Sequence, residues 1–210
     1  MKVAIFGATG EIGKTILWEL MDRGHEVTAI VRTPSKIEMV HERLRVEQGD
    51  VLNPNQVADF SAGQDAVVSA YGPKFGEEEE LLEVTRSLIE GVRRGNAGRL
   101  VVVGGAGSLM TDSGEMLMNT PGFPEEVKPL AQAHADAYGI LKESNIHWTF
   151  MSPAATITTG RRTGQFRIGM NRVITDDLGE SSISVGDFAA ALVDELDDPQ
   201  FIQAQFTVGY

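Results

Sequence analysis

Short apolar runs alternate with amphipathic stretches along most of the chain. Residues 2–6 (KVAIF) form an apolar run without polar alternation, which is typical of a strand covered on both faces. The next stretch has apolar residues at helical spacing and ends at Gly24, a residue suited to a helix C-terminus. The alternation continues, predicting further strands at 26–31, 44–51, 65–72, 99–107 and 146–153 and helices at 34–44, 53–63, 77–95 and 125–144. This order predicts parallel βαβ units, and therefore an α/β fold with a doubly wound parallel sheet.

The last part of the chain follows a different pattern. Residues 160–174 alternate loosely around glycines and predict a β-hairpin, a helix is expected from about Ser184, and 203–210 predict a final strand. No Pro-rich, Gly/Ser-rich or charged linker divides the chain. We therefore interpret residues 1–210 as a single domain, with substrate-side elements in 104–125 and 154–184.

Charge and composition narrow the range of partners. Lys and Arg number 18 against 30 Asp and Glu, a net charge of −12. Such a surface repels phosphate backbones and anionic lipid, so we expect neither nucleic acid nor a membrane as partner. The chain has no cysteine, which fits a cytoplasmic location, and its four histidines lack metal-ligand spacing, so no metal is expected. The expected partner is a small molecule, bound by a monomer or a homodimer.

Three glycines lie between the first predicted strand and the first predicted helix. In a doubly wound sheet this turn faces the ligand crevice. Gly7 would allow the tight turn, Gly10 would let a pyrophosphate approach the backbone, and Gly13 would let helix and strand pack closely. The free amides and dipole of the helix would bind the phosphates, and Thr9 can add a hydroxyl. The spacing and its context predict a dinucleotide site.

The segment GATGEIG (7–13) resembles the G-x-x-G-x-x-G motif of the short-chain dehydrogenase/reductase superfamily. The chain is most similar to its atypical single-domain members: NmrA-like proteins, biliverdin reductase B-like flavin reductases and the small bacterial NADH-flavin reductase group. GDVLNP, DAVVSAYG, RLVVVGGAGSL, SNIHWTFMSP and SSISVGDFAAALVDELDDP also match, so the resemblance covers nearly the whole chain. It implies a Rossmann fold that binds NAD(P)(H).

The resemblance also implies individual contacts. Asp50 and Val51 would contact adenine, and residues 70–72 would line the ribose–pyrophosphate side. The implied cofactor-binding set is Gly7, Ala8, Thr9, Gly10, Glu11, Ile12, Asp50, Val51, Ala70, Tyr71, Gly72, Gly104, Pro153 and Ala154, the last two beside the nicotinamide. Glu11 departs from expectation, because a carboxylate in a phosphate loop repels pyrophosphate unless it points outward.

The end of the second predicted strand bears on the choice of dinucleotide. NAD-selective proteins usually carry an acidic residue there for the ribose hydroxyls. This chain has none; it has Arg32 and Lys36, with Thr33 as a further donor. A guanidinium can hold a 2′-phosphate with two hydrogen bonds, so we expect NADP(H) to be preferred over NAD(H). The alternative is a pair of solvated surface cations.

Two residues are candidates for the chemistry. The resemblance places Ser108 where the superfamily keeps a substrate-facing serine, although a turn serine that bonds its own backbone is an equal alternative. His134 lies earlier in its predicted helix than Tyr138 and could bind ribose or act as an acid; packing is its alternative. Tyr138-x-x-x-Lys142 matches the superfamily's proton-donor motif but lies too near the helix end, so we interpret it as structural.

The lack of a well-placed Tyr/Lys pair favours certain acceptors. A flavin or quinone spreads the incoming charge over its ring, and solvent can protonate it, so orientation in a dry pocket would suffice. We therefore expect an NAD(P)H-dependent reductase of flavins, quinones or similar aromatic acceptors, with the Met-rich segment at 108–124 as a lid. A non-catalytic NADP(H) sensor of the NmrA type is the alternative, and a sugar-nucleotide epimerase is disfavoured.

Overall fold

An eight-stranded sheet forms the centre of the computed structural model, which describes residues 1–210. Its strand order is β3-β2-β1-β4-β5-β6-β10-β8, and every neighbouring pair is parallel except β10 with β8. The strands are β1 (Lys2–Phe6), β2 (Glu26–Val31), β3 (Leu44–Gln48), β4 (Ala66–Ser69), β5 (Leu100–Val103), β6 (Trp148–Ser152), β8 (Arg167–Gly169) and β10 (Ala204–Gly209). The order 3-2-1-4-5-6 is that of the doubly wound Rossmann fold, so the predicted fold class is confirmed.

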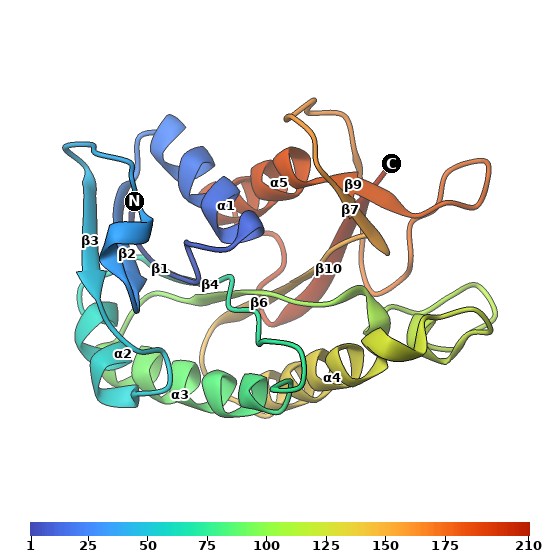
Figure 1. Cartoon of the computed structure of the whole chain (residues 1–210), viewed down its shortest axis with the longest axis horizontal. Coiled ribbons are helices and arrows are strands. Elements are labelled where there is room, and N and C mark those ends of the chain that lie inside the picture. Colours follow the sequence, from blue (N-terminus) through green and yellow to red (C-terminus); the bar gives the residue numbers. More distant parts are fainter.

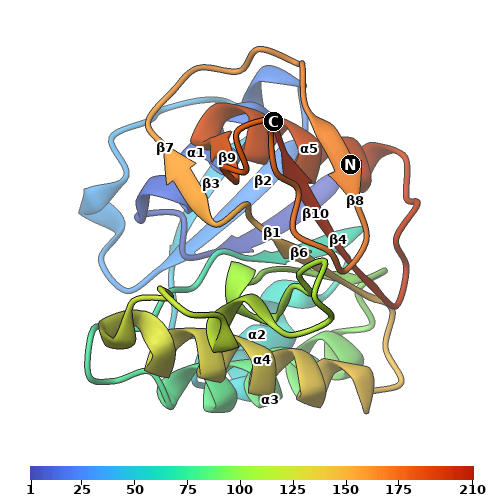
Figure 2. The same cartoon turned by 90° about the vertical axis from the view of Figure 1, so that its right-hand side faces the viewer.

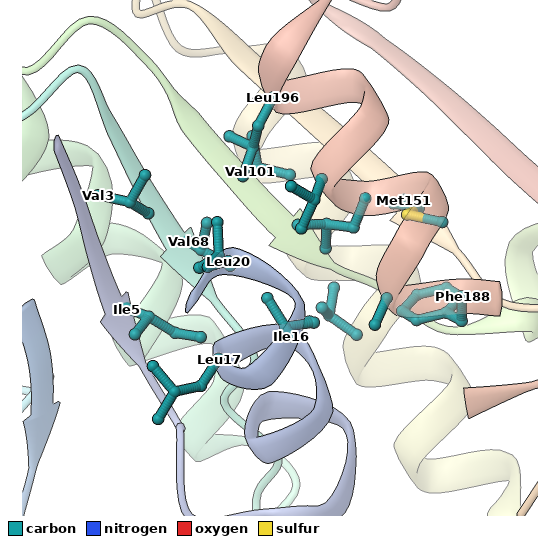
Figure 3. Packing of buried hydrophobic residues seen from close by; sticks show 14 of the residues in the cluster. Val3, Ile5, Ile16, Leu17, Leu20, Val68, Val101, Met151, Phe188 and Leu196 are labelled. Carbon is teal, nitrogen blue, oxygen red and sulfur yellow. The ribbon is translucent and has the colours of Figure 1, made fainter. Parts of the chain in front are cut away.

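Helices cover both faces of this sheet (Figures 1 and 2). One face carries α1 (Glu11–Asp22) and α5 (Val185–Asp197), and the other carries α2 (Pro54–Ser61), α3 (Glu80–Gly95) and α4 (Lys128–Lys142). Strand β1 shows why its sequence lacks polar alternation. Val3 and Ile5 pack under α1 and α5 (Figure 3), whereas Ala4 and Phe6 belong to the core on the opposite face. The strand is buried on both sides, as a continuous apolar run predicts.

One predicted helix is nearly absent. Of residues 34–44, only η1 (Pro34–Lys36) is helical, as a single 3₁₀ turn. Beyond it, Ile37 and Met39 pack against the core while Glu38 and Val40 are exposed. This alternation has a period of two, which an extended chain satisfies and a helix does not. The predicted helix over 34–44 was therefore wrong.

The predicted hairpin over 160–174 was also wrong. Strand β8 pairs with the edge of β10, where Thr207 lies opposite Gly169, and not with the residues that follow it. Residue Arg172 instead forms a bridge with Met110. The edge of β10, a strand of six residues, gives β8 its pairing partner. No periodicity in the sequence identifies a pairing between such distant segments. A second, two-stranded sheet joins β7 (Thr156–Thr158) to β9 (Ser182–Ser184).

The C-terminal prediction is confirmed: α5 begins directly after Ser184, whose Oγ accepts a hydrogen bond of 3.0 Å from the amide of Asp187. The Asp187 carboxylate is itself completely buried. It accepts hydrogen bonds from the Tyr210 hydroxyl (2.6 Å), the amide and hydroxyl of Thr163 (both 2.7 Å) and the Gly164 amide (2.8 Å). One carboxylate thus ties the loop at 160–165 and the last residue of the chain to the start of α5.

These bonds set the pH behaviour of Asp187. Burial alone would raise the pKa of its carboxyl, but the hydrogen bonds from Tyr210, Thr163 and Gly164 outweigh burial and lower it. A lowered pKa means that the ionised form stabilises the folded chain above the unfolded-state value of about 3.9. This contribution is lost as the pH falls through the lower pKa of the folded state.

We expect Asp187→Asn to lower the free energy of unfolding by roughly 2–4 kcal/mol at pH 7, because charged hydrogen bonds are replaced by neutral ones and one amide group then faces other donors. As the pH falls below about 3.9 and then through the lower pKa of folded Asp187, the difference from the unsubstituted protein should shrink, since the carboxyl becomes protonated first in the unfolded state and then in the folded state. Urea unfolding at pH 7 and at a series of acidic pH values measures this. The matched control is Asp177→Asn, an exposed carboxylate; equal stability of the two variants at pH 7 would contradict the assignment.

Candidate nucleotide site

Two of the three loop glycines are required by packing. Gly7 has φ of +84°, and a Cβ there would lie 2.4 Å from the carbonyl oxygen of Ala70. A Cβ on Gly13 would lie 2.1 Å from the carbonyl oxygen of Gly7. Gly10 differs, because the nearest atom to a Cβ there is 3.7 Å away. The protein therefore leaves the backbone at Gly10 open on the side where the sequence predicts a pyrophosphate.

The first turn of α1 has backbone amides without a protein partner. Gly10 is the N-cap and supplies no side-chain hydrogen bond. The amides of Glu11, Ile12 and Gly13 donate to no atom of the protein. Free amides at a helix N-terminus, together with the helix dipole, favour a phosphate group. These residues thus fit the diphosphate of a dinucleotide.

A cleft of about 400 Å³ opens at this turn, beyond the carboxyl ends of β1, β2 and β4. Its lining includes eleven residues of the predicted cofactor set: Gly7, Thr9, Gly10, Glu11, Ile12, Arg32, Asp50, Val51, Ala70, Tyr71 and Gly72. Six predicted residues lie outside the lining: Ala8, Thr33, Lys36, Gly104, Pro153 and Ala154. The structure therefore assembles the adenosine and phosphate half of the predicted site in one cavity.

The residues outside the cleft have identifiable surroundings. Ala8 and Ala154 belong to the core under α1 and α5. Gly104 is buried, and a Cβ there would lie 2.1 Å from the ring of Phe150, so packing explains this glycine. Thr33 and Lys36 are exposed on the segment after β2.

Arg32 lies on the rim of the cleft, at the end of β2. Its side chain is exposed and forms no ion pair with any carboxylate, in a protein with a net charge of −12. An unpaired guanidinium is available to a phosphate. The Glu11 carboxylate, by contrast, accepts a hydrogen bond from Thr159 Oγ1 at 3.5 Å. It is therefore engaged with the loop after β7.

Local hydrogen bonds hold the part of the cleft after β3, where the resemblance implies an adenine contact. The Asp50 amide donates to Gln56 Oε1 (2.8 Å), and Asp50 Oδ1 accepts from the Leu52 amide (3.0 Å). Gly49, which sequence reasoning missed, is fixed by packing, since a Cβ there would lie 2.6 Å from Ile30 Cγ2 and 2.7 Å from Phe60 Cε2. These contacts make the turn after β3 a rigid wall.

Glu80 is a further lining residue that sequence reasoning missed. It comes from the first turn of α3, and the Tyr71 hydroxyl donates to its carboxylate. Burial, and then the Glu80 carboxylate, raise the pKa of Tyr71 well above its ordinary value. The acidic first turn predicts a helix start and gives no sign that this carboxylate faces a cleft.

Ser108 lies in the 3₁₀ turn η2 (Ala106–Ser108) that follows β5. It is buried, and its hydroxyl accepts a hydrogen bond from Gln205 Nε2 at 3.0 Å. The alternative of a turn serine that bonds its own backbone is therefore wrong. His134, on α4, packs against the same segment: a Cβ on Gly105 would lie 2.9 Å from its Cδ2 atom.

His134 is neutral at physiological pH. Burial lowers the pKa of its imidazole to about 4, and its Nδ1 is buried without a hydrogen-bond partner. A ring in this state can offer a neutral hydrogen bond, and it carries no proton to give as a charged acid at pH 7. The acid role is thus disfavoured, whereas the ribose contact stays a prediction.

The geometry of Tyr138 agrees with its interpretation as structural. Its ring lies 5.9 Å from that of Trp148 and 5.0 Å from that of Phe150, and Lys142 Nζ lies 4.7 Å from its centre. Trp148 opens β6, so this cluster is at the strand end opposite the cleft. The Tyr/Lys pair therefore lies away from the cleft.

The fold and the site together define a single-domain NAD(P)-binding Rossmann protein. The family described as NAD(P)H-binding matches residues 7–199, and the chain belongs to it. YwnB of Bacillus subtilis (strain 168), a protein without an assigned function, is 41% identical over 99% of this chain and 98% of its own length.

Solved structures agree with this membership. A protein from Bacteroides thetaiotaomicron, described as a candidate epimerase, is 41% identical with a TM-score of 0.93 over 100% of this chain and 96% of that one. A candidate NADH-flavin reductase from Streptococcus pneumoniae is 36% identical, with a TM-score of 0.89, over 100% of this chain and 99% of that one. These relatives support the resemblance to the small reductase group of the superfamily.

The glycine geometry predicts two opposite outcomes. Gly10→Ala should keep its thermal midpoint within a few degrees but bind NADPH at least about tenfold more weakly, because the methyl group occupies the space left for phosphate. Gly13→Ala should lower the midpoint strongly, since its Cβ meets a fixed backbone carbonyl. Calorimetric titration and thermal unfolding measure the two effects. Full NADPH affinity in Gly10→Ala would exclude the proposed phosphate position.

Proposed function

We propose that this protein is an NADPH-preferring reductase that passes hydride to a flavin, quinone or similar aromatic acceptor. The observation that carries the proposal is the cleft at the N-terminus of α1, with three unpartnered amides and an unpaired Arg32. A bound nicotinamide would supply the hydride. Resemblance to the reductase group, which includes the candidate NADH-flavin reductase of Streptococcus pneumoniae, supports this reaction class.

The preference for NADPH rests on charge at the end of β2. The cleft carries no carboxylate from the end of β2, where NAD-selective proteins bind the ribose hydroxyls. Arg32 stands there without an acidic partner. A guanidinium in this position gains a charge-assisted hydrogen bond only from the phosphorylated ribose. Lys36 would add charge at longer range.

The acceptor class follows from the proton donors that the site lacks. His134 is neutral, and Tyr138 belongs to a structural cluster, which leaves the Ser108 hydroxyl as the polar group after β5. A serine can polarise a carbonyl or ring oxygen but is a poor acid for a localised alkoxide. An aromatic acceptor spreads the charge and takes its proton from solvent.

The same lack of a charged acid keeps one alternative open, a non-catalytic NADP(H) sensor of the NmrA type. Such a protein would bind the dinucleotide in the same cleft and reduce nothing. For either function we propose a small-molecule ligand, a cytoplasmic location and a monomer or homodimer. None of the helices is both long and apolar enough to span a bilayer.

Turnover distinguishes the two functions. We expect the purified protein to oxidise NADPH in the presence of FMN or menadione, measured as loss of nicotinamide absorbance, at a rate that saturates with acceptor. Tight NADPH binding without turnover on flavins, quinones or biliverdin-like acceptors would instead favour the sensor.

Arg32→Ala tests the coenzyme preference. We expect NADPH affinity to fall by roughly 10- to 100-fold, the range for loss of a charged hydrogen bond, while NADH affinity changes by less than about threefold. Fluorescence titration with both coenzymes gives the ratio. Arg86→Ala is the matched control, because this exposed arginine on α3 lies outside the cleft. An unchanged NADPH/NADH ratio in Arg32→Ala would remove the assigned 2′-phosphate contact.

A further inference from the structure

A buried chain of polar side chains links the last strand of the sheet to Ser108. Gln205 on β10, Ser108 in η2 and Ser152 at the end of β6 are only 5%, 8% and 0% exposed. Gln205 Nε2 lies 3.0 Å from Ser108 Oγ and 2.9 Å from Ser152 Oγ. Ser152 Oγ in turn lies 2.9 Å from the carbonyl oxygen of Gly105. These polar atoms lie among apolar neighbours, where each hydrogen bond has a defined direction.

The direction of each bond follows from what its partners can do. The Gly105 carbonyl only accepts, so the single proton of Ser152 is donated to it. The amide atom of Gln205 next to Ser152 must therefore be the donor, which fixes the orientation of the side-chain amide. Its two N–H groups serve Ser152 and Ser108.

These bonds leave the hydroxyl proton of Ser108 without a partner in the protein. Its oxygen already accepts from Gln205, so its own proton is free to be donated. No carbonyl or carboxylate of the protein accepts that proton. The hydroxyl is thus held as a hydrogen-bond donor before any ligand arrives.

We propose that Gln205 is a positioning residue that keeps Ser108 oriented as a donor to a carbonyl or ring oxygen of the acceptor. This inference rests on the proposed function, because it gives Ser108 an acceptor to polarise. Preorganised donors of this kind act where negative charge develops, without the cost of turning at the moment of reaction. Gln205 itself does not touch the reacting atoms in this scheme.

Gln205 suits this role because of where its strand lies. Strand β10 joins the parallel sheet beside β6 (Figure 2). Within this pair Gln205 lies opposite Phe150. The residue therefore comes from a strand that is paired on both sides, with β6 and β8, and not from the segment that carries Ser108. An ionised glutamate there would only accept hydrogen bonds, so the Ser108 hydroxyl would donate to it and not to a ligand. A methionine of similar length would not donate a hydrogen bond to Ser108.

A double-mutant cycle tests the proposal. Ser108→Ala should lower kcat for menadione about 10- to 100-fold. Gln205→Met should lower this kcat about threefold or more, and Gln205→Glu should lower it further. In both variants the dissociation constant for NADPH should stay within about twofold of that of the unsubstituted protein. Neither Gln205 substitution should lower kcat again when Ser108 is already alanine, because Gln205 acts only through that hydroxyl. Gln132→Met, an exposed glutamine on α4, is the control.

A structural role alone would give a different pattern. The proposal would be overturned if the Gln205 substitutions lowered kcat by the same factor in the Ser108→Ala variant as in the unsubstituted protein. It would also be overturned if kcat were unchanged in both Gln205→Met and Gln205→Glu. Two variants are used because a charged residue at this buried position can disturb folding, which thermal unfolding will reveal.

A binding measurement separates this proposal from the proposed function. Menadione affinity is measured on the protein saturated with NADP⁺, where no hydride is available. If the unsubstituted protein binds menadione but never reduces it, the reductase assignment fails, and the same cycle on binding still decides the role of Gln205. If it does not bind menadione, FMN or biliverdin-like acceptors at all, the positioning role is overturned as well.

Discussion

The contact between the first helix and the first strand is the constraint on which the rest of the structure depends. Gly13 approaches the carbonyl of Gly7 so closely that a single methyl group would separate the two elements. This approach sets the start of α1 at the ends of the central strands, and with it the direction of three free amides. A displacement of α1 would also disturb its packing on α5 and on β1 (Figure 3), so the core and the proposed phosphate site depend on the same contact.

A protein of net charge −12 can hold a polyanion because binding depends on local donors. Backbone amides carry partial charges that do not enter the net count, and the helix dipole adds to them. Arg32 adds one full charge at the rim. The three carboxylates that line the cleft each accept a hydrogen bond from the protein: Glu11 from Thr159, Asp50 from the Leu52 amide and Glu80 from Tyr71. The acidic surface elsewhere keeps nonspecific anions away. The net charge of this chain therefore does not decide whether its cleft can bind an anion.

Sequence patterns predicted those features whose cause is local. The glycine spacing, the apolar run of β1 and the helix that begins near Ser184 each have a local physical reason, and the structure has all of them. The helix expected at 34–44 failed because apolar residues in a short segment fit either period. The hairpin at 160–174 failed because β8 pairs with a strand whose partner residues lie 38 to 42 positions later, and local alternation does not reveal that partner. Glu80 was missed for another reason: it is only nine residues from Tyr71, but an acidic residue in the first turn of a helix gives no sign of facing a cleft.

Ser108 shows how a site residue can be located from sequence while its chemical state is not. A resemblance places a serine after the fifth strand, but whether its hydroxyl donates or accepts depends on atoms 97 residues away. Those atoms belong to a strand that looks in the sequence like a plain β-run. The Gly105 carbonyl directs Ser152, Ser152 directs the amide of Gln205, and this amide leaves Ser108 its proton. In the proposed scheme the sheet thus supplies the orientation of a hydroxyl that lies in the segment after β5.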